Sequence, residues 1–154
     1  MRFKTISALL LIFFVACESK KTDAPVASVV SPLVGTWKLV SGTTIQGTDT
    51  VTTDYTKNKD FVKVINSTHF SFVGHDLTKG KDSIPFYSSG AGTYSLKDSL
   101  YTENLQFCND RMWEGNSFPF TIKIENDSLI QTGVEKVEKI NVNRLNVERY
   151  VRVK

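Results

Sequence analysis

A strict alternation of apolar and polar residues late in the chain constrains the fold more than any other feature. Every second residue between positions 117 and 125 is large and apolar: Phe118, Phe120, Ile122 and Ile124. Successive side chains of a β-strand point to opposite faces, so this pattern predicts a strand with one buried face. A helix of the same sequence would scatter these side chains around its whole surface.

The residues after this strand predict a tight hairpin. Asn126 and Asp127 tolerate positive φ, as a two-residue turn between antiparallel strands requires. A turn at this position would place Ile124 opposite Leu129, and Ile122 opposite Gln131. The sequence therefore predicts not only two strands but also their register.

The chain from Trp37 onward consists of short strand-like runs separated by turn residues, without a sustained helical period. This indicates an all-β domain. In the first run, Trp37, Leu39 and Ser41 are predicted to share one face. We interpret residues 140–154 as a closing strand that pairs with the first strand, because closure removes sheet edges that would otherwise invite aggregation.

The N-terminal segment has the layout of a secretory signal peptide, predicted over residues 1–16. Arg2 and Lys4 precede an apolar run that ends at Ala16 and is shorter than the ~20 residues a membrane-spanning helix needs. Phe14-Val15-Ala16-Cys17 resembles the lipobox of bacterial lipoproteins, with phenylalanine where leucine is usual. The resemblance implies that Cys17 is lipidated. The alternative is an ordinary secreted protein with a chance cysteine there.

Residues 17–32 are predicted to form a lipid-anchored flexible tether, because they are polar, then small, and contain two prolines. With Cys17 lipidated, Cys108 has no partner for a disulfide within the chain, and we expect a partly buried free thiol. The barrel domain is then expected over residues 33–154.

Charge and motifs argue against several function classes. The formal charge of +3 falls to +1 once Arg2 and Lys4 are removed, too little for a nucleic-acid surface. The sequence has no phosphate loop, serine nucleophile elbow or Cys/His cluster, so we predict no enzyme and no cofactor.

The two histidines are not expected to bind a metal ion. His69 and His75 lie ~20 Å apart along a strand, so no metal site is predicted. We expect a hydrogen-bonded His69 and a solvated His75.

Five motifs in order resemble a known family. They are Gly35-Thr36-Trp37-Lys38-Leu39-Val40, Thr68-His69-Phe70, Gly92 to Leu96, Tyr101-Thr102-Glu103, and Phe120 to Glu125. Together they resemble the lipocalin-like domain family of bacterial secreted and lipid-anchored proteins, a domain of unknown function. The resemblance covers most of residues 33–154 and is weaker over 105–108 and 135–146.

This resemblance implies a single antiparallel up-and-down β-barrel, with a short helical turn before Trp37. It also implies that Arg152 lies over the Trp37 indole and closes one end of the barrel. The opposite end would be the mouth. Small barrels of about eight strands either fill their interior with side chains or hold one small ligand.

The candidate lining follows from the alternation in each strand. In the central run, Tyr101, Glu103, Leu105 and Phe107 share one face, and Leu100, Thr102 and Asn104 share the other; a period of two leaves open which face points inward. We take the first face as the inner one. The candidate ligand-lining residues are Phe70, Phe72, Tyr94, Tyr101, Glu103, Phe118, Phe120 and Ile122.

The leading functional hypothesis is a binding protein for a small apolar or amphipathic ligand, held in the cell envelope outside the cytoplasm. Lipidated Cys17 would anchor it to a bacterial membrane, with the outer membrane favoured. The alternative is a structural or adaptor lipoprotein whose barrel is filled and whose outer surface docks a protein partner. An enzyme would instead need convergent titratable groups inside the mouth.

Overall fold

A computed structural model describes residues 31–154. The predicted signal peptide, Cys17 and most of the predicted tether lie outside the described residues. The described chain forms these strands: β1 (Gly35–Gln46), β2 (Asp49–Asp54), β3 (Lys59–Ile65), β4 (His69–Asp76), β5 (Tyr87–Lys97), β6 (Leu100–Cys108), β7 (Ser117–Glu125), β8 (Ser128–Val137) and β9 (Val142–Arg152). Two short 3-10 turns, η1 (Arg111–Trp113) and η2 (Glu138–Ile140), connect strands.

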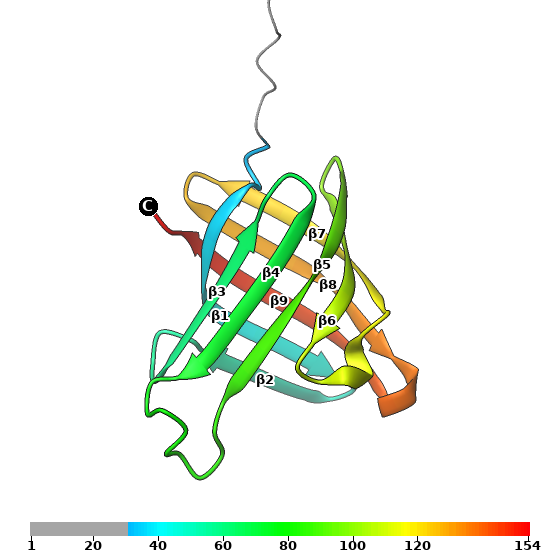
Figure 1. The fold of residues 1–154 in the computed structure, drawn as a ribbon. Coiled ribbons are helices and arrows are strands. Elements are labelled where there is room, and N and C mark those ends of the chain that lie inside the picture. The colour runs from blue at the N-terminus through cyan, green and yellow to red at the C-terminus, as the bar shows by residue number, and fades with distance from the viewer. Residues whose placement is uncertain (1–30) are drawn as a thin grey trace, which may run out of the picture.

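The strands close into an antiparallel barrel, which confirms the predicted fold class (Figure 1). From β3 to β9, each strand pairs with the one that follows it along the chain. Strand β1 pairs with both β3 and β9 and so completes a barrel of eight strands. Strand β2 folds back on the second half of β1. The last strand therefore closes the barrel against the first, as the sequence predicted.

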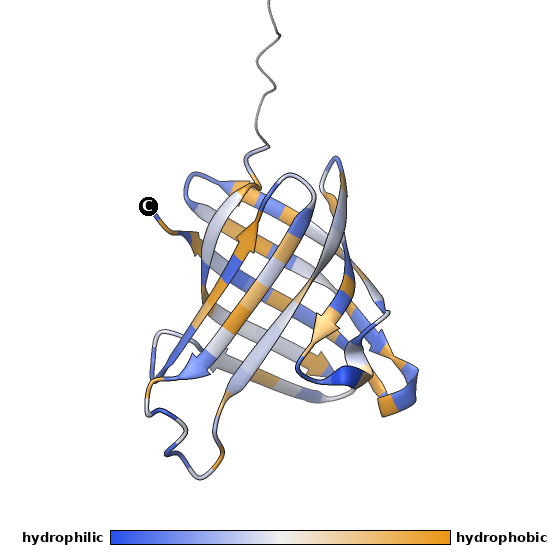
Figure 2. Ribbon diagram, viewed as in Figure 1, coloured by the Kyte–Doolittle hydropathy of each residue, from blue (hydrophilic) through white to orange (hydrophobic). Residues whose placement is uncertain are grey.

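The predicted hairpin between β7 and β8 has the predicted register. Asn126 has a φ of 53°, Ile124 pairs with Leu129, and Ile122 pairs with Gln131. Figure 2 shows hydrophobic and hydrophilic residues alternating along the strands of the barrel. In β7 this alternation is complete, because Phe118, Phe120 and Ile122 are buried while their neighbours are exposed.

A bulge in β1 overturns the prediction that Ser41 shares the face of Trp37 and Leu39. Leu39 pairs with Tyr150 and Ser41 with Arg149, so Val40 is an additional residue on β1. An extra residue reverses the faces of all that follow it. Ser41 therefore lies on the outer face with Arg149, while the next residue, Gly42, lines the interior.

A second bulge, in β6, has the same effect on Phe107. Tyr101, Glu103 and Leu105 are buried, as expected for an inner face. Gly92 then pairs with Leu105 and Ala91 with Phe107, which leaves Gln106 as the extra residue. Phe107 is 66% exposed as a result. The prediction that it continues the inner face was wrong.

The hydrophobic core is concentrated at the end of the barrel where β1 begins and β9 ends, here called the closed end. Trp37 is fully buried, and its indole nitrogen donates to the Leu33 carbonyl over 2.9 Å. The guanidinium carbon of Arg152 lies 4.1 Å from the centroid of the Trp37 ring. The opposite end of the barrel, here called the mouth, carries the longer connections, including residues 77–86 and 109–116.

A single hydrogen-bonded turn precedes β1, in which the Val34 amide donates to the Ser31 carbonyl over 3.0 Å. The segment before Trp37, where the resemblance implied a short helical turn, thus contains a single hydrogen-bonded turn. Within residues 31–154, none of the helices is long and apolar enough to cross a membrane.

Candidate ligand cavity

The interior of the barrel contains a cavity of about 420 Å³ on the mouth side. Side chains from every strand line it, and residues of the connections at the mouth surround it. Cavities that bind small molecules have volumes of about 300 to 1,000 Å³. The barrel is therefore filled at one end and hollow at the other.

A buried ion pair forms the floor of the cavity. Lys63 on β3 and Glu103 on β6 pair with each other, and their residues are 2% and 6% exposed. The Lys63 ammonium also donates to the Gln131 side-chain oxygen over 3.0 Å. The rings of Phe70, Tyr101 and Tyr150 surround the ammonium nitrogen, with centroids 5.5 to 5.6 Å away. Lys63 is therefore held on all sides by the protein.

Burial at this floor raises the pKa of its acidic groups. Burial raises the pKa of the Glu103 carboxyl, and the neighbouring Lys63 ammonium offsets part of that rise. Burial also raises the pKa of Tyr101, with a further contribution from the Glu103 charge. Both effects follow from the cost of holding a negative charge where water is excluded.

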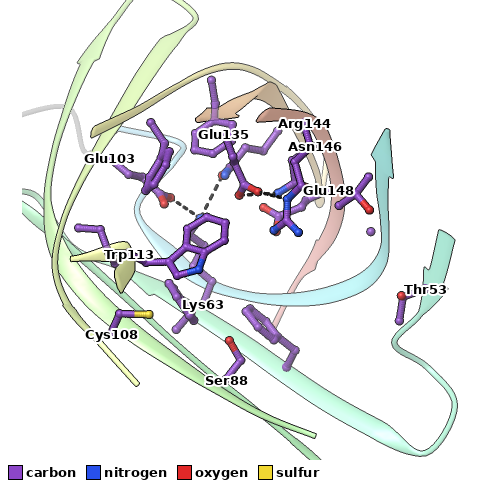
Figure 3. A pocket seen from close by; sticks show the side chains of 18 of the residues that line it. Thr53, Lys63, Ser88, Glu103, Cys108, Trp113, Glu135, Arg144, Asn146 and Glu148 are labelled. Atoms are coloured by element: carbon purple, nitrogen blue, oxygen red, sulfur yellow. Dashed lines mark hydrogen bonds and ion pairs between the residues drawn. The ribbon is translucent and has the colours of Figure 1, made fainter. Parts of the chain in front are cut away.

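A second polar cluster forms one wall of the cavity (Figure 3). Glu135 on β8 pairs with the Arg144 guanidinium on β9 over 2.7 Å and accepts a hydrogen bond from the Asn146 amide over 2.9 Å. Arg144 also stacks on Trp113, with 5.1 Å between its guanidinium carbon and the ring centroid. Burial raises the pKa of Glu135, and the Arg144 charge opposes that rise.

Glu148 on β9 is the remaining carboxylate of the interior. One of its oxygens accepts a hydrogen bond from the Tyr150 hydroxyl over 2.8 Å. Among residues 31–154, no lysine or arginine forms an ion pair with it. Figure 3 shows Glu148 beside the cluster of Glu135, Arg144 and Asn146.

Aromatic rings form the apolar part of the cavity near the mouth. Tyr55 packs edge-on against Phe61 and Phe86, with centroids 5.7 and 6.0 Å apart. On the other side, Trp113 packs against Phe118 at 5.7 Å. A molecule in the cavity would contact these rings while its polar end reached the floor and the wall.

Local hydrogen bonds hold the connections at the mouth in place. Asp76 at the end of β4 is buried and accepts hydrogen bonds from the Gly80 amide, the Phe86 amide and the Thr78 hydroxyl. These bonds fix Phe86 over the cavity and keep the pKa of Asp76 below its usual value. Asp110 caps η1 by accepting from the Met112 amide, which places Trp113.

The predicted lining residues divide between the two ends of the barrel. Phe72, Glu103, Phe118 and Phe120 line the cavity. The other four belong to the apolar packing around and below it: Phe70, Tyr101 and Ile122 are buried in the core, and Tyr94 packs against that core with its hydroxyl donating to the Asn66 carbonyl.

Sequence reasoning missed most of the polar residues of the cavity: Lys63, Gln131, Glu135, Arg144, Asn146 and Glu148. Two signals could have found them. Lys63 alternates in step with Phe61 and Ile65, so it lies on the same face of β3 as these two buried residues. Likewise, every second residue of β9 from Arg144 to Tyr150 faces inward.

The two histidines and Cys108 lie in different surroundings. His69 contacts the Thr68 hydroxyl over 2.7 Å, and His75 contacts the Asp76 carbonyl over 2.7 Å; both residues are exposed. Cys108 is half-buried beside the cavity, and burial raises the pKa of its thiol. Within the described part of the chain, no three His, Cys, Asp or Glu side chains are grouped to hold a metal ion.

Comparison with known proteins does not place this chain in a family. No protein-family model and no curated protein sequence matches this chain.

Proposed function

We propose that this protein is a lipocalin-like binding protein that holds one small amphipathic molecule in the mouth side of its barrel. The observation that carries the proposal is the cavity of about 420 Å³, with buried polar groups on its floor and wall and aromatic rings near the mouth. Such a combination of apolar enclosure and a few fixed polar groups is typical of small-molecule sites.

The cavity also weighs against the alternative of a filled barrel that serves as an adaptor. In a filled barrel, side chains from opposite walls meet at the centre, as they do here only toward the closed end. Space of this size leaves the side chains around it without the packing contacts that a filled barrel would give them. A ligand would restore those contacts.

We further propose that the protein works outside the cytoplasm, attached to a bacterial membrane through lipidated Cys17, the outer membrane being favoured. The basic start, the apolar run and the Phe14-Val15-Ala16-Cys17 motif support this location. Expression of the wild type and of Cys17→Ala in a bacterium, followed by membrane fractionation, tests the anchor. The wild type should sediment with membranes; equal release of both proteins would contradict the proposal.

Binding is tested with N-phenyl-1-naphthylamine, a neutral dye whose fluorescence rises in apolar surroundings. Ser88 and Ser89 are neighbours on β5, and only Ser88 lines the cavity; Ser89 pairs with the outward Val73. Ser88→Trp should fill part of the cavity and weaken dye binding at least about tenfold. Ser89→Trp adds the same side chain outside and should leave binding unchanged.

Thermal unfolding of both variants establishes that the barrel is intact. If the dye does not bind the wild type, or if both tryptophan variants weaken it equally, the ligand-binding proposal is wrong.

A further inference from the structure

The charged residues of the cavity are not balanced, and this imbalance restricts the chemistry of a ligand. Besides Asp110 at the exposed mouth, the charged side chains that line the cavity are Lys63, Glu103, Glu135, Arg144 and Glu148. Three of these are carboxylates and two are cations. A cavity lined by a surplus of one sign of charge attracts a molecule of the other sign.

Both cations are already engaged. Lys63 pairs with Glu103 and donates to Gln131, and its ammonium lies among three aromatic rings. Arg144 pairs with Glu135 and stacks on Trp113. An anionic ligand, such as a fatty acid, would have to break one of these pairs and leave a buried carboxylate without its cation, which is costly.

Of the three interior carboxylates, Glu148 is the one without a cation. Its only hydrogen-bond donor among the described residues is the Tyr150 hydroxyl, which binds the Oε2 atom. Its charge contributes to raising the pKa of Glu103, Glu135 and Tyr150, which shows that it acts on both the floor and the wall of the cavity. A positive charge placed next to Glu148 would relieve all of these repulsions together.

The rings near the mouth suit the same kind of ligand. Tyr55, Phe61, Phe86, Trp113 and Phe118 line the cavity around its polar part. Aromatic faces attract cations and also enclose an apolar body. The cavity therefore offers a carboxylate for a positively charged nitrogen and rings for the rest of the molecule.

We propose that the ligand is a cationic amphiphile, a small molecule with a protonated amine or similar nitrogen that binds Glu148 while its apolar part lies among the aromatic rings. This inference rests on the proposed function, because it names the class of ligand for the same cavity.

The test compares three soluble probes that share a phenyl ring and a short chain: 4-phenylbutylamine, 4-phenylbutanol and 4-phenylbutanoate. Isothermal titration calorimetry on the purified protein measures each dissociation constant. The amine should bind at least about tenfold more tightly than the alcohol, because a charge-assisted hydrogen bond is stronger than a neutral one. The carboxylate should bind most weakly.

Two variants assign the preference to one side chain. Glu148→Gln removes the charge but retains an oxygen acceptor for Tyr150, so it should weaken the amine about tenfold and leave the alcohol unchanged. Glu125→Gln makes the same exchange on an exposed residue of β7 and should change neither. Thermal unfolding again shows whether each variant is folded.

The outcomes separate this inference from the proposed function. Equal binding of amine and alcohol, or tightest binding of the carboxylate, would overturn the cationic ligand while the barrel remained a binding protein. Binding of the naphthylamine dye without binding of any phenylbutyl probe would have the same meaning. If the dye also failed to bind, the proposed function itself would be wrong.

Discussion

Strand β9 carries two arginines that each stack on a tryptophan, one at each end of the barrel. At the closed end, Arg152 lies 4.1 Å from the Trp37 centroid and donates to the carbonyls of Val34 and Pro32. At the mouth, Arg144 lies 5.1 Å from the Trp113 centroid and pairs with Glu135. The same two side-chain types are used, but their partners differ.

The difference separates a pair packed into the core from a pair that borders the cavity. The closed-end pair satisfies backbone groups next to a fully buried indole, so its contacts stabilise the fold. The mouth pair combines a half-buried indole with a carboxylate beside an open cavity. Its contacts shape one wall of the cavity. One strand thus contributes to the filled core at one end and to the cavity wall at the other.

The largest expected effect comes from truncating the two tryptophans. Trp37→Ala should lower the free energy of unfolding by about 3 to 5 kcal/mol, because it leaves a large hole in a filled core. Trp113→Ala should lower it by less, about 1 to 3 kcal/mol, because the indole is only half-buried and packs against one aromatic ring. Urea unfolding followed by circular dichroism measures both. Equal losses would show that the two ends do not differ in role.

The ion pair of Lys63 and Glu103 lies at the cavity floor, between the filled end and the hollow end of the barrel. Substitutions of Lys63 test how much this pair contributes to stability. Lys63→Met should cost about 3 to 5 kcal/mol, because it leaves the buried Glu103 charge without a partner. Adding Glu103→Met should recover most of that loss. Lys38→Met, which breaks an ion pair with Asp60 whose side chains are about 40% exposed, should cost about 0 to 1 kcal/mol.

The Lys63→Met variant should also depend on pH in a defined direction. Burial already raises the pKa of Glu103 above its unfolded value, and removing Lys63 raises it further. The folded state then binds a proton that the unfolded state releases, so stability falls as the pH rises. The deficit of the variant relative to wild type should be larger at pH 7 than at pH 5. A pH-independent deficit would contradict a buried carboxylate at this position.

The smallest expected effect concerns Asp54 at the mouth. Hydrogen bonds from the Thr56 hydroxyl and amide, with Lys57 nearby, lower the pKa of Asp54 to about 2. A lowered pKa contributes stability above the unfolded value of 3.8, and that contribution is lost as the pH falls toward 2.

The melting temperatures of wild type and Asp54→Ala measure this contribution. The difference between them should be largest at pH 5 and shrink as the pH falls toward 2. A difference as large at pH 2 as at pH 5 would assign the effect to packing instead of charge.

The predictable part of this structure follows from patterns that repeat along the chain. The alternation in residues 117–125 and the Asn126-Asp127 turn predicted a strand, a hairpin and its register, because each depends on local geometry. The closing strand was predicted for a global reason, since an open sheet would expose its edges.

The bulges at Val40 and Gln106 could not be predicted, because one inserted residue leaves no mark in composition. Each nevertheless reverses a face, which exposes Phe107 and turns Cys108 toward the cavity. The polar cavity was missed for another reason. An inward lysine such as Lys63 violates the expectation that charged residues face water, and its tertiary partner, Glu103, lies on a strand far along the chain.

The position where the chain enters the barrel has a mechanical consequence. Arg152 binds the carbonyls of Pro32 and Val34, so the segment leading into β1 is fastened beside the buried indole. If the protein is anchored through Cys17 as proposed, a pull on that segment would act first on the closed end of the barrel. The mouth lies at the opposite end, so a molecule would enter or leave it away from the point of attachment.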